Sequence, residues 1–174
     1  MAASRPSGLF MKRTIPMAAG LLYAGTALAK APLEHRVGLA GSGDVSYGWV
    51  TDITAVGAAG GGWWSMHGRH AGLQVELLDR VLVAHQVPQN VAGVRLSYAH
   101  LFGDRAATTR GVATIGAEGL FFSGLLPVLP FFVATGGAEW GLGDRGFLRA
   151  EAQAFFAPAP ALGLGPRLSG GWSF

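Results

Sequence analysis

The chain has 174 residues, of which 50% are hydrophobic and only 13% are charged. Soluble domains carry about a quarter charged residues, so this composition disfavours an ordinary soluble domain. The absence of cysteine excludes a disulfide framework, a thiolate metal site and a thiol nucleophile.

The N-terminal stretch from Met11 to Ala29 reads MKRTIPMAAGLLYAGTALA. Two basic residues, an apolar run and an Ala-Leu-Ala ending follow one another in the order of a cleavable secretory signal peptide. The apolar run is shorter than the roughly 20 residues of a membrane-spanning helix. We therefore expect a signal peptide at 1–29 and a single domain at 30–174. Translation could start at Met1 or at Met11, which leaves it open whether 1–10 belong to the protein.

The net charge of +3 belongs mostly to this leader. Three of the 13 basic residues, Arg5, Lys12 and Arg13, precede residue 30, which leaves ten basic and ten acidic residues in the rest of the chain. No run of basic residues is present, so the sequence argues against nucleic acid as a partner.

Beyond residue 34, apolar residues alternate with small or polar ones in segments of about ten residues that turn residues separate. Polar tight turns occur at 66–70, 103–110 and 143–146, which is every second break. These turns and both termini should lie on the same side. The predicted strands are 35–41, 52–65, 71–82, 91–103, 110–122, 128–142, 147–156 and 162–174.

Most predicted strands have one apolar face and one face of small residues with few charges. The exception is 52–65, where GAAGGGWW has no clean polar face and leaves the register of the strand open. Small residues suit a crowded interior, so the apolar face should contact lipid. Open sheet edges cannot exist in hydrocarbon because their amides would lack partners, and the sheet must therefore close. We predict an all-β fold: a closed, antiparallel, eight-stranded, up-and-down transmembrane β-barrel.

The chain ends in LSGGWSF, with Leu168, Trp172 and Phe174 at alternating positions. This ending resembles the C-terminal signal that the outer-membrane assembly machinery reads. The pattern and length of residues 30–174 resemble the small OmpA/OmpX-type barrels. The resemblance implies a location in the outer membrane of a Gram-negative bacterium. Its implied partners are outer-membrane lipid, periplasmic chaperones and the barrel-assembly machinery.

Aromatic residues gather near the predicted strand ends, as expected for girdles at the two membrane interfaces. The periplasmic set is Trp63, Trp64, Tyr98, Phe102, Trp140, Trp172 and Phe174. The opposite set is Tyr47, Trp49, Phe121, Phe122, Phe131 and Phe156.

Charged residues on the inward parity should fill the lumen as paired groups, because an eight-stranded barrel leaves room only for side chains. We interpret them as a structural network, and a proton or ion pathway is the functional alternative. Arg95 should meet Glu118, and Arg167 should meet Glu151. The predicted set is Glu76, Arg95, Glu118, Glu139, Arg149, Glu151 and Arg167.

Nothing in the sequence indicates an enzyme, a cofactor or a metal site. No serine lies two positions after a histidine, as lipid-deacylating barrels would require, and the pair His67 and His70, expected in a turn, lacks a clear third ligand. We expect a structural or adhesion-like role through outward loops at 41–52, 83–90 and 157–161, with the extracellular ligand unknown. Solute or ion transport, a lipid-modifying enzyme and a helical inner-membrane protein built on 119–138 are the alternatives.

We predict that export removes the leader between Ala29 and Lys30, because Pro32 would hinder cleavage after Ala31. N-terminal sequencing of the membrane-extracted protein should begin KAPLEHR. An intact start at Met1 or Met11 would contradict the prediction.

Deleting Phe174 should reduce insertion into the outer membrane while leaving export unchanged, since the terminal aromatic residue is the end of the proposed assembly signal. Cell fractionation should find the shortened protein degraded or in the periplasm. Insertion at the level of the full-length chain would refute the interpretation of this ending.

Overall fold

The structure, a computed structural model, describes residues 33–84, 86–104, 107–122, 129–157 and 161–174. Within these ranges the chain forms eight β-strands and no helix. No helix in the described part of the chain is long and apolar enough to cross a membrane. The strands are β1 (Glu34–Gly48), β2 (Ile53–His67), β3 (Ala71–Ala84), β4 (Val87–Phe102), β5 (Thr109–Phe122), β6 (Leu129–Leu142), β7 (Gly146–Ala157) and β8 (Ala161–Ser173).

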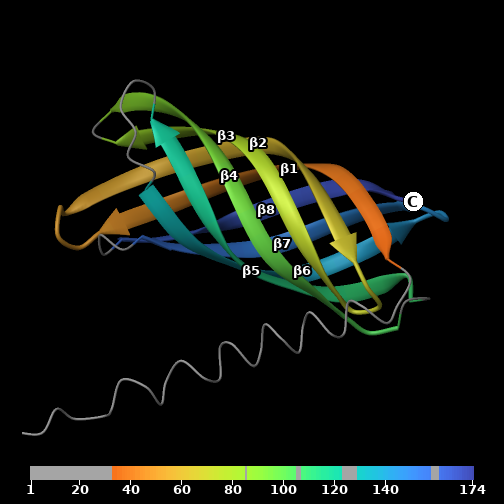
Figure 1. The fold of residues 1–174 in the computed structure, drawn as a ribbon. Helices are drawn as coiled ribbons and strands as arrows, with labels where there is room; N and C mark the ends of the chain where they lie inside the picture. Colours follow the sequence, from red (N-terminus) through yellow and green to blue (C-terminus); the bar gives the residue numbers. More distant parts are fainter. Residues whose placement is uncertain (1–32, 85, 105–106, 123–128, 158–160) are drawn as a thin grey trace, which may run out of the picture.

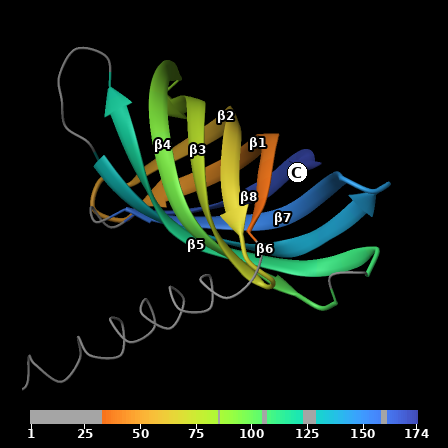
Figure 2. The same cartoon turned by 45° about the vertical axis from the view of Figure 1, so that its right-hand side comes forward.

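The eight strands form a closed barrel in which each strand is antiparallel to the next and β8 returns to pair with β1 (Figure 1). Following the paired residues around the wall from Arg36 leads back to β1 at Ser46, ten residues farther along. This stagger requires tilted strands, which are visible in Figure 2. Closure gives every strand two neighbours and leaves no open edge. The predicted fold class is confirmed.

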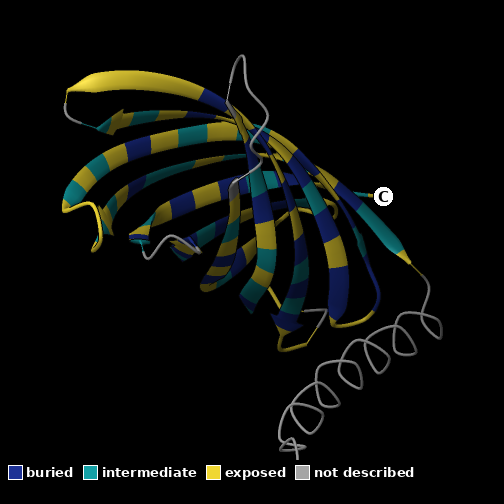
Figure 3. Ribbon diagram, turned by 60° about the vertical axis from the view of Figure 1, so that its left-hand side comes forward, coloured by how far each residue is buried: buried dark blue, intermediate teal, exposed yellow. Residues whose placement is uncertain are grey.

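Burial alternates along each strand, as Figure 3 shows by its bands. The pattern is inverted relative to a soluble protein: Leu39 is 74% exposed, whereas the Arg149 side chain in the interior is 1% exposed. Large apolar side chains cover the outer face, and the lumen holds charged and small side chains together with some buried apolar ones, such as Leu78 and Phe147. Such a surface is suited to hydrocarbon and not to water.

Both ends of the described chain lie at one end of the barrel, where the His35 amide donates to the Phe174 carbonyl oxygen at 3.1 Å. The turns after β2, β4 and β6 lie at the same end. We call this the periplasmic end, following the sequence prediction, and the opposite one the extracellular end.

Two strands extend at least four residues beyond a predicted end. β1 continues to Gly48, which pairs with Ile53, and β4 begins at Val87, which pairs with Ala84. The composition of both segments is typical of turns, which predicted that their backbone groups would be unpaired. In the structure a neighbouring strand pairs with them. The predicted loop 41–52 therefore shortens to a turn at 49–52, and of the predicted loop 83–90 only Gln86 lies outside a strand among the described residues. Of the third loop, 158–160 lies outside the described residues.

The alternative of a membrane helix over 119–138 is wrong for the described residues. Residues 119–122 end β5, and residues 129–138 belong to β6. The segment 123–128 and the predicted signal peptide at 1–29 lie outside the described residues.

Two aromatic residues that we assigned to the girdles face the lumen instead. Trp63 is buried inside the barrel, and Phe131 packs against the buried residues Leu78, Val91 and Leu120. The glycine-rich run before Trp63 had left the parity of β2 undecided. The Phe122 side chain lies outside the described set. The other predicted girdle residues keep the outward parity.

One charged residue lies on the outer face within the eight strands. Asp79 is exposed, and its strand partners are the small residues Gly60 and Ala92. It lies five residues before the extracellular end of β3. The free-energy cost of a lipid-facing carboxylate is smaller near a membrane interface than at the bilayer centre. We therefore expect Asp79 to lie near the extracellular interface of the membrane.

Candidate functional site

The barrel interior holds the chain's largest collection of charged side chains. Within the described residues, the interior charges balance as six arginines and six carboxylates, most of them nearly inaccessible to solvent. They are Arg36, Arg80, Arg95, Arg110, Arg149, Arg167, Glu34, Asp44, Glu76, Glu118, Glu139 and Glu151. Buried charges are tolerated when they are paired and hydrogen-bonded, and the contacts below show how this is achieved.

A central group of seven charges fills the middle of the lumen. Arg95 donates to Glu118 Oε2 through Nε at 2.8 Å and Nη2 at 2.5 Å. Arg80 joins Asp44 and Glu118 at 3.2 and 3.1 Å. These contacts bring side chains of β1, β3, β4 and β5 together, so the group braces several strands at once.

The same group continues across the barrel through Arg167 on β8. Its two terminal nitrogens donate to the two oxygens of Glu76 at 2.9 and 3.0 Å, and its Nε lies 3.4 Å from Glu151 Oε2. A two-pronged arginine–carboxylate contact fixes orientation as well as charge. Because β3 and β8 are not neighbours in the sheet, this contact spans the lumen.

A second group lies at the periplasmic end and centres on Glu139. Its Oε2 accepts from Arg36 Nη1 at 2.9 Å and from Arg149 Nε at 2.7 Å, and its Oε1 accepts from Arg110 Nη2. Glu34 accepts from Arg36 Nε at 2.7 Å. Three guanidinium groups thus converge on one carboxylate.

Aromatic rings support the guanidinium groups of this periplasmic group. Arg149 lies 5.3 Å from the Trp63 ring centroid, and Arg36 lies 4.8 Å from that of Phe147. Trp63 can turn inward because its partner on β1 is Gly38, where a Cβ would lie 2.8 Å from Trp63 Cζ2. A bulkier residue at position 38 would displace the ring and remove the surface on which Arg149 stacks.

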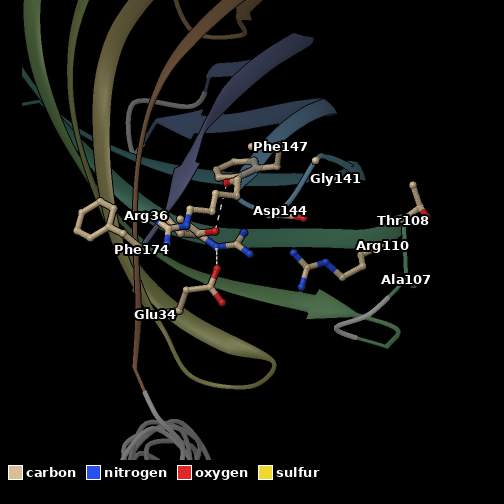
Figure 4. A pocket seen from close by; sticks show the side chains of 13 residues that line it. Glu34, Arg36, Ala107, Thr108, Arg110, Gly141, Asp144, Phe147 and Phe174 are labelled. Carbon is tan, nitrogen blue, oxygen red and sulfur yellow. Dashed lines mark hydrogen bonds and ion pairs between the residues drawn. The ribbon is translucent and has the colours of Figure 1, made fainter.

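The lumen opens at the periplasmic end into a cavity of about 620 Å³, which we call the vestibule (Figure 4). In Figure 4 the guanidinium groups of Arg36 and Arg110 turn toward each other, with Glu34 beside Arg36. Phe147 covers part of the wall, and Asp144 and Arg145 of the β6–β7 turn lie at the rim.

The structure places all seven predicted lumen residues in the interior and brings the two expected pairs into contact. Arg95 meets Glu118 and Arg167 meets Glu151, and Glu139 also meets Arg149. It also shows five interior charges that sequence reasoning missed. Arg36, Arg80 and Arg110 have inward parity within predicted strands, so strict alternation could have found them. Asp44 lay in a stretch interpreted as a loop, and Glu34 precedes the predicted start of β1.

Of the two histidines expected in a turn, His67 is instead the last residue of β2 and is buried in the lumen, where its ring fits against Gly72. His70 lies in the connection between β2 and β3 as predicted, and its ring stacks near that of His100, with centroids 6.5 Å apart. Across the ranges that the structure covers, no three histidine, aspartate or glutamate side chains are placed to hold a metal ion.

The residues of the predicted assembly signal lie on the outer face of β8 and just beyond it. Leu168, Trp172 and Phe174 are exposed there, and the Phe174 ring stacks on His35 with centroids 6.2 Å apart. This placement makes the three side chains available to a membrane or a protein. Their role in assembly stays a prediction.

Two solved structures share this architecture. The N-terminal β-barrel domain of Pseudomonas aeruginosa OprF matches with a TM-score of 0.57 and 13% identity, over 80% of this chain and 97% of that one. Neisserial surface protein A (NspA) matches with a TM-score of 0.57 and 8% identity, again over 80% and 97%. The chain has the fold of the small outer-membrane β-barrels. No protein-family model and no curated protein matches it.

The outer-membrane barrel fold accounts for the inverted distribution of apolar and charged residues. At these sequence identities the likeness extends to the fold alone, so it says nothing about the role of the interior charges. The match covers almost the whole of both neighbouring chains, and the described strands account for the same closed barrel.

The pair Arg95 and Glu118 offers a quantitative test of this interior. Replacing one partner with alanine leaves the other charge without its closest partner, so each of the variants Arg95→Ala and Glu118→Ala should lose on the order of 3–5 kcal/mol of unfolding free energy. The double variant should lose clearly less than the sum. Reversible urea unfolding in lipid vesicles would measure these values.

A matched control combines Glu118→Ala with Arg36→Ala. Arg36 is equally buried but belongs to the periplasmic group, so these two losses should add.

A charge placed at the outward Leu96 should cost roughly 2–4 kcal/mol of unfolding free energy near the bilayer centre, and Glu118→Ala should not rescue it. Strict additivity for Arg95 and Glu118 would mean that their contact contributes nothing.

Proposed function

We propose that this protein is a closed outer-membrane barrel without enzymatic activity or an open pore, and that it acts at the cell surface through its extracellular end. The single observation that carries the proposal is the composition of the extracellular half of the barrel. Buried apolar side chains and paired charges occupy the lumen there, while the hairpins expose apolar side chains to the outside.

An apolar cluster supports the absence of a pore. Leu78, Val91 and Leu120 are buried against one another on the lumen side of β3, β4 and β5, with Leu82 and Phe131 packed against them. The central charge group crosses the barrel beside this cluster, with Arg80 at the register of Val91 and Asp44 at that of Leu82. A solute would have to displace both groups of side chains, and an eight-stranded barrel offers no spare width.

The hairpin between β1 and β2 supports a surface role. Its turn presents Trp49 and Val50, and Val50 is 78% exposed. The turn is ordered by the Tyr47 hydroxyl, which donates to Asp52 Oδ1 at 2.7 Å, and by a ring contact of Tyr47 with Trp49. Exposed apolar side chains on an ordered turn provide contact area at low entropic cost.

The β3–β4 hairpin extends the same end of the barrel (Figure 1). Its upper strands carry the exposed residues Val83 and Val87. Single exposed apolar residues are common, but a set on neighbouring hairpin tips is typical of an interaction surface. The proposed surface therefore comprises the tips of β1–β2 and β3–β4.

The proposed role includes export, insertion by the barrel-assembly machinery and residence in the outer membrane of a Gram-negative bacterium. The fold and the exposed apolar belt support the location. The terminal residues Trp172 and Phe174 support recognition during assembly.

Replacing Trp49 and Val50 together with serine should lower the attachment of expressing cells to a surface toward the level of cells lacking the protein. The turn would keep its Tyr47–Asp52 hydrogen bond but lose its exposed apolar contacts. Attachment assays with equal amounts of protein in the outer membrane would measure the effect.

Leu142→Ser is the matched control, because Leu142 is exposed at the opposite, periplasmic end. This variant should attach like the unchanged protein. Equal attachment by all three proteins would argue against the surface role. Unitary currents from the purified protein in planar bilayers would instead favour transport through the barrel.

A further inference from the structure

The interior charges balance overall, but they are not evenly distributed along the barrel. The central group has three arginines and four carboxylates, namely Arg80, Arg95, Arg167, Asp44, Glu76, Glu118 and Glu151. The periplasmic group has three arginines and two carboxylates, namely Arg36, Arg110, Arg149, Glu34 and Glu139. Within the periplasmic group the arginines therefore outnumber the carboxylate side chains by one.

The two groups are not joined by an ion pair within the described ranges. Gln74 lies between them and accepts from Arg149 Nη1 at a long 3.4 Å. Glu151 attracts Arg149 electrostatically but does not reach it. The excess charge is thus only partly offset from within the lumen.

Donor groups in the periplasmic group are left without acceptors. Arg149 Nη2 is buried and has no hydrogen-bond partner, and neither ring nitrogen of the buried His67 has one. Arg110 uses only Nη2, on Glu139. A donor without an acceptor carries a desolvation cost when it is buried. Of these residues Arg110 lines the cavity at this end, so its unused nitrogens are the ones that a ligand there could reach.

Arg149 and His67 do not line the vestibule, but Arg36 and Arg110 do, and these two arginines hold the two different oxygens of Glu139 between them. Arg36 is 97% buried, and its Nη2 makes no hydrogen bond within the described residues. Asp144 and Arg145 at the rim have opposite formal charges, so together they add no net charge to the vestibule.

We propose that the vestibule binds an anionic group, a carboxylate or a phosphate, between Arg36 and Arg110. The ligand would accept hydrogen bonds from the guanidinium faces opposite Glu139. Guanidinium groups are suited to both anions because their parallel N–H bonds match two oxygens at once. The cavity of about 620 Å³ leaves room for a small molecule attached to the anion, with the Phe147 ring as an apolar wall.

Glu34 allows a more specific test of the proposal, because its carboxylate competes with the ligand for Arg36. Its carboxylate accepts from Arg36 Nε and lines the vestibule. Removing its charge should raise the affinity for an external anion, whereas removing Arg110 should lower it. A general attraction of anions to the protein would respond much less to these two single changes.

The test titrates the refolded full-length mature protein, in zwitterionic detergent, with sodium acetate or inorganic phosphate at constant ionic strength set with sodium chloride. Arginine Nε–H signals in nuclear magnetic resonance report the binding. Signals of Arg36 and Arg110 should shift and saturate, with a dissociation constant of about a millimolar or below. Acetate and phosphate in separate arms distinguish a carboxylate ligand from a phosphate ligand.

Arg110→Gln should weaken binding by about tenfold or more, and Glu34→Gln should strengthen it several-fold, because charge-assisted hydrogen bonds are the main contacts. Arg69→Gln is the matched control, since Arg69 lies exposed in the β2–β3 turn at the same end and does not line the vestibule. Circular dichroism confirms that each variant folds. Shifts that never saturate, or equal weakening by Arg110→Gln and Arg69→Gln, would overturn the proposal.

Discussion

The narrow lumen is the constraint on which the rest of this structure depends. Alternation along a strand sends every second side chain inward, and eight strands enclose a space that side chains must fill completely. Charges in that space persist only as paired groups. The sequence meets this demand with two ion-pair groups and with glycines that make room for rings. At Gly38, for example, only hydrogen leaves space for Trp63, on which Arg149 then stacks.

The sequence predicts this fold correctly where apolar and polar residues alternate clearly along a strand. Glu139 and Arg149 belong to clean alternating segments, and they were assigned correctly to the lumen. Trp63 was assigned wrongly because the glycines before it have no side chain from which to infer parity. Asp44 was missed because Gly41, Ser42 and Gly43 have the composition of a turn, although β2 supplies them with paired backbone partners. Local composition cannot show that a neighbouring strand continues.

Contacts across the lumen were harder to predict than contacts between adjacent strands. Arg95 and Glu118 are direct neighbours in the register, so parity and turn length are enough to pair them. Glu139 and Arg36 come from β6 and β1, and their contact depends on the stagger of the closed barrel and on side-chain length. The opposite charge excess of the two groups has the same origin. It becomes visible only when the relative heights of all eight strands are known.

The long sequence separations of these contacts have a consequence for folding. Arg36 and Glu139 are 103 residues apart, and Arg167 and Glu76 are 91 apart. None of their shared hydrogen bonds can form while the sheet is open, because the strands that carry them are not adjacent. In a partly assembled sheet these charges keep their partners on the same or an adjacent strand but lack the contacts across the lumen. The contacts across the lumen therefore stabilise only the completed cylinder, and they favour closure over any intermediate that lacks its final strand.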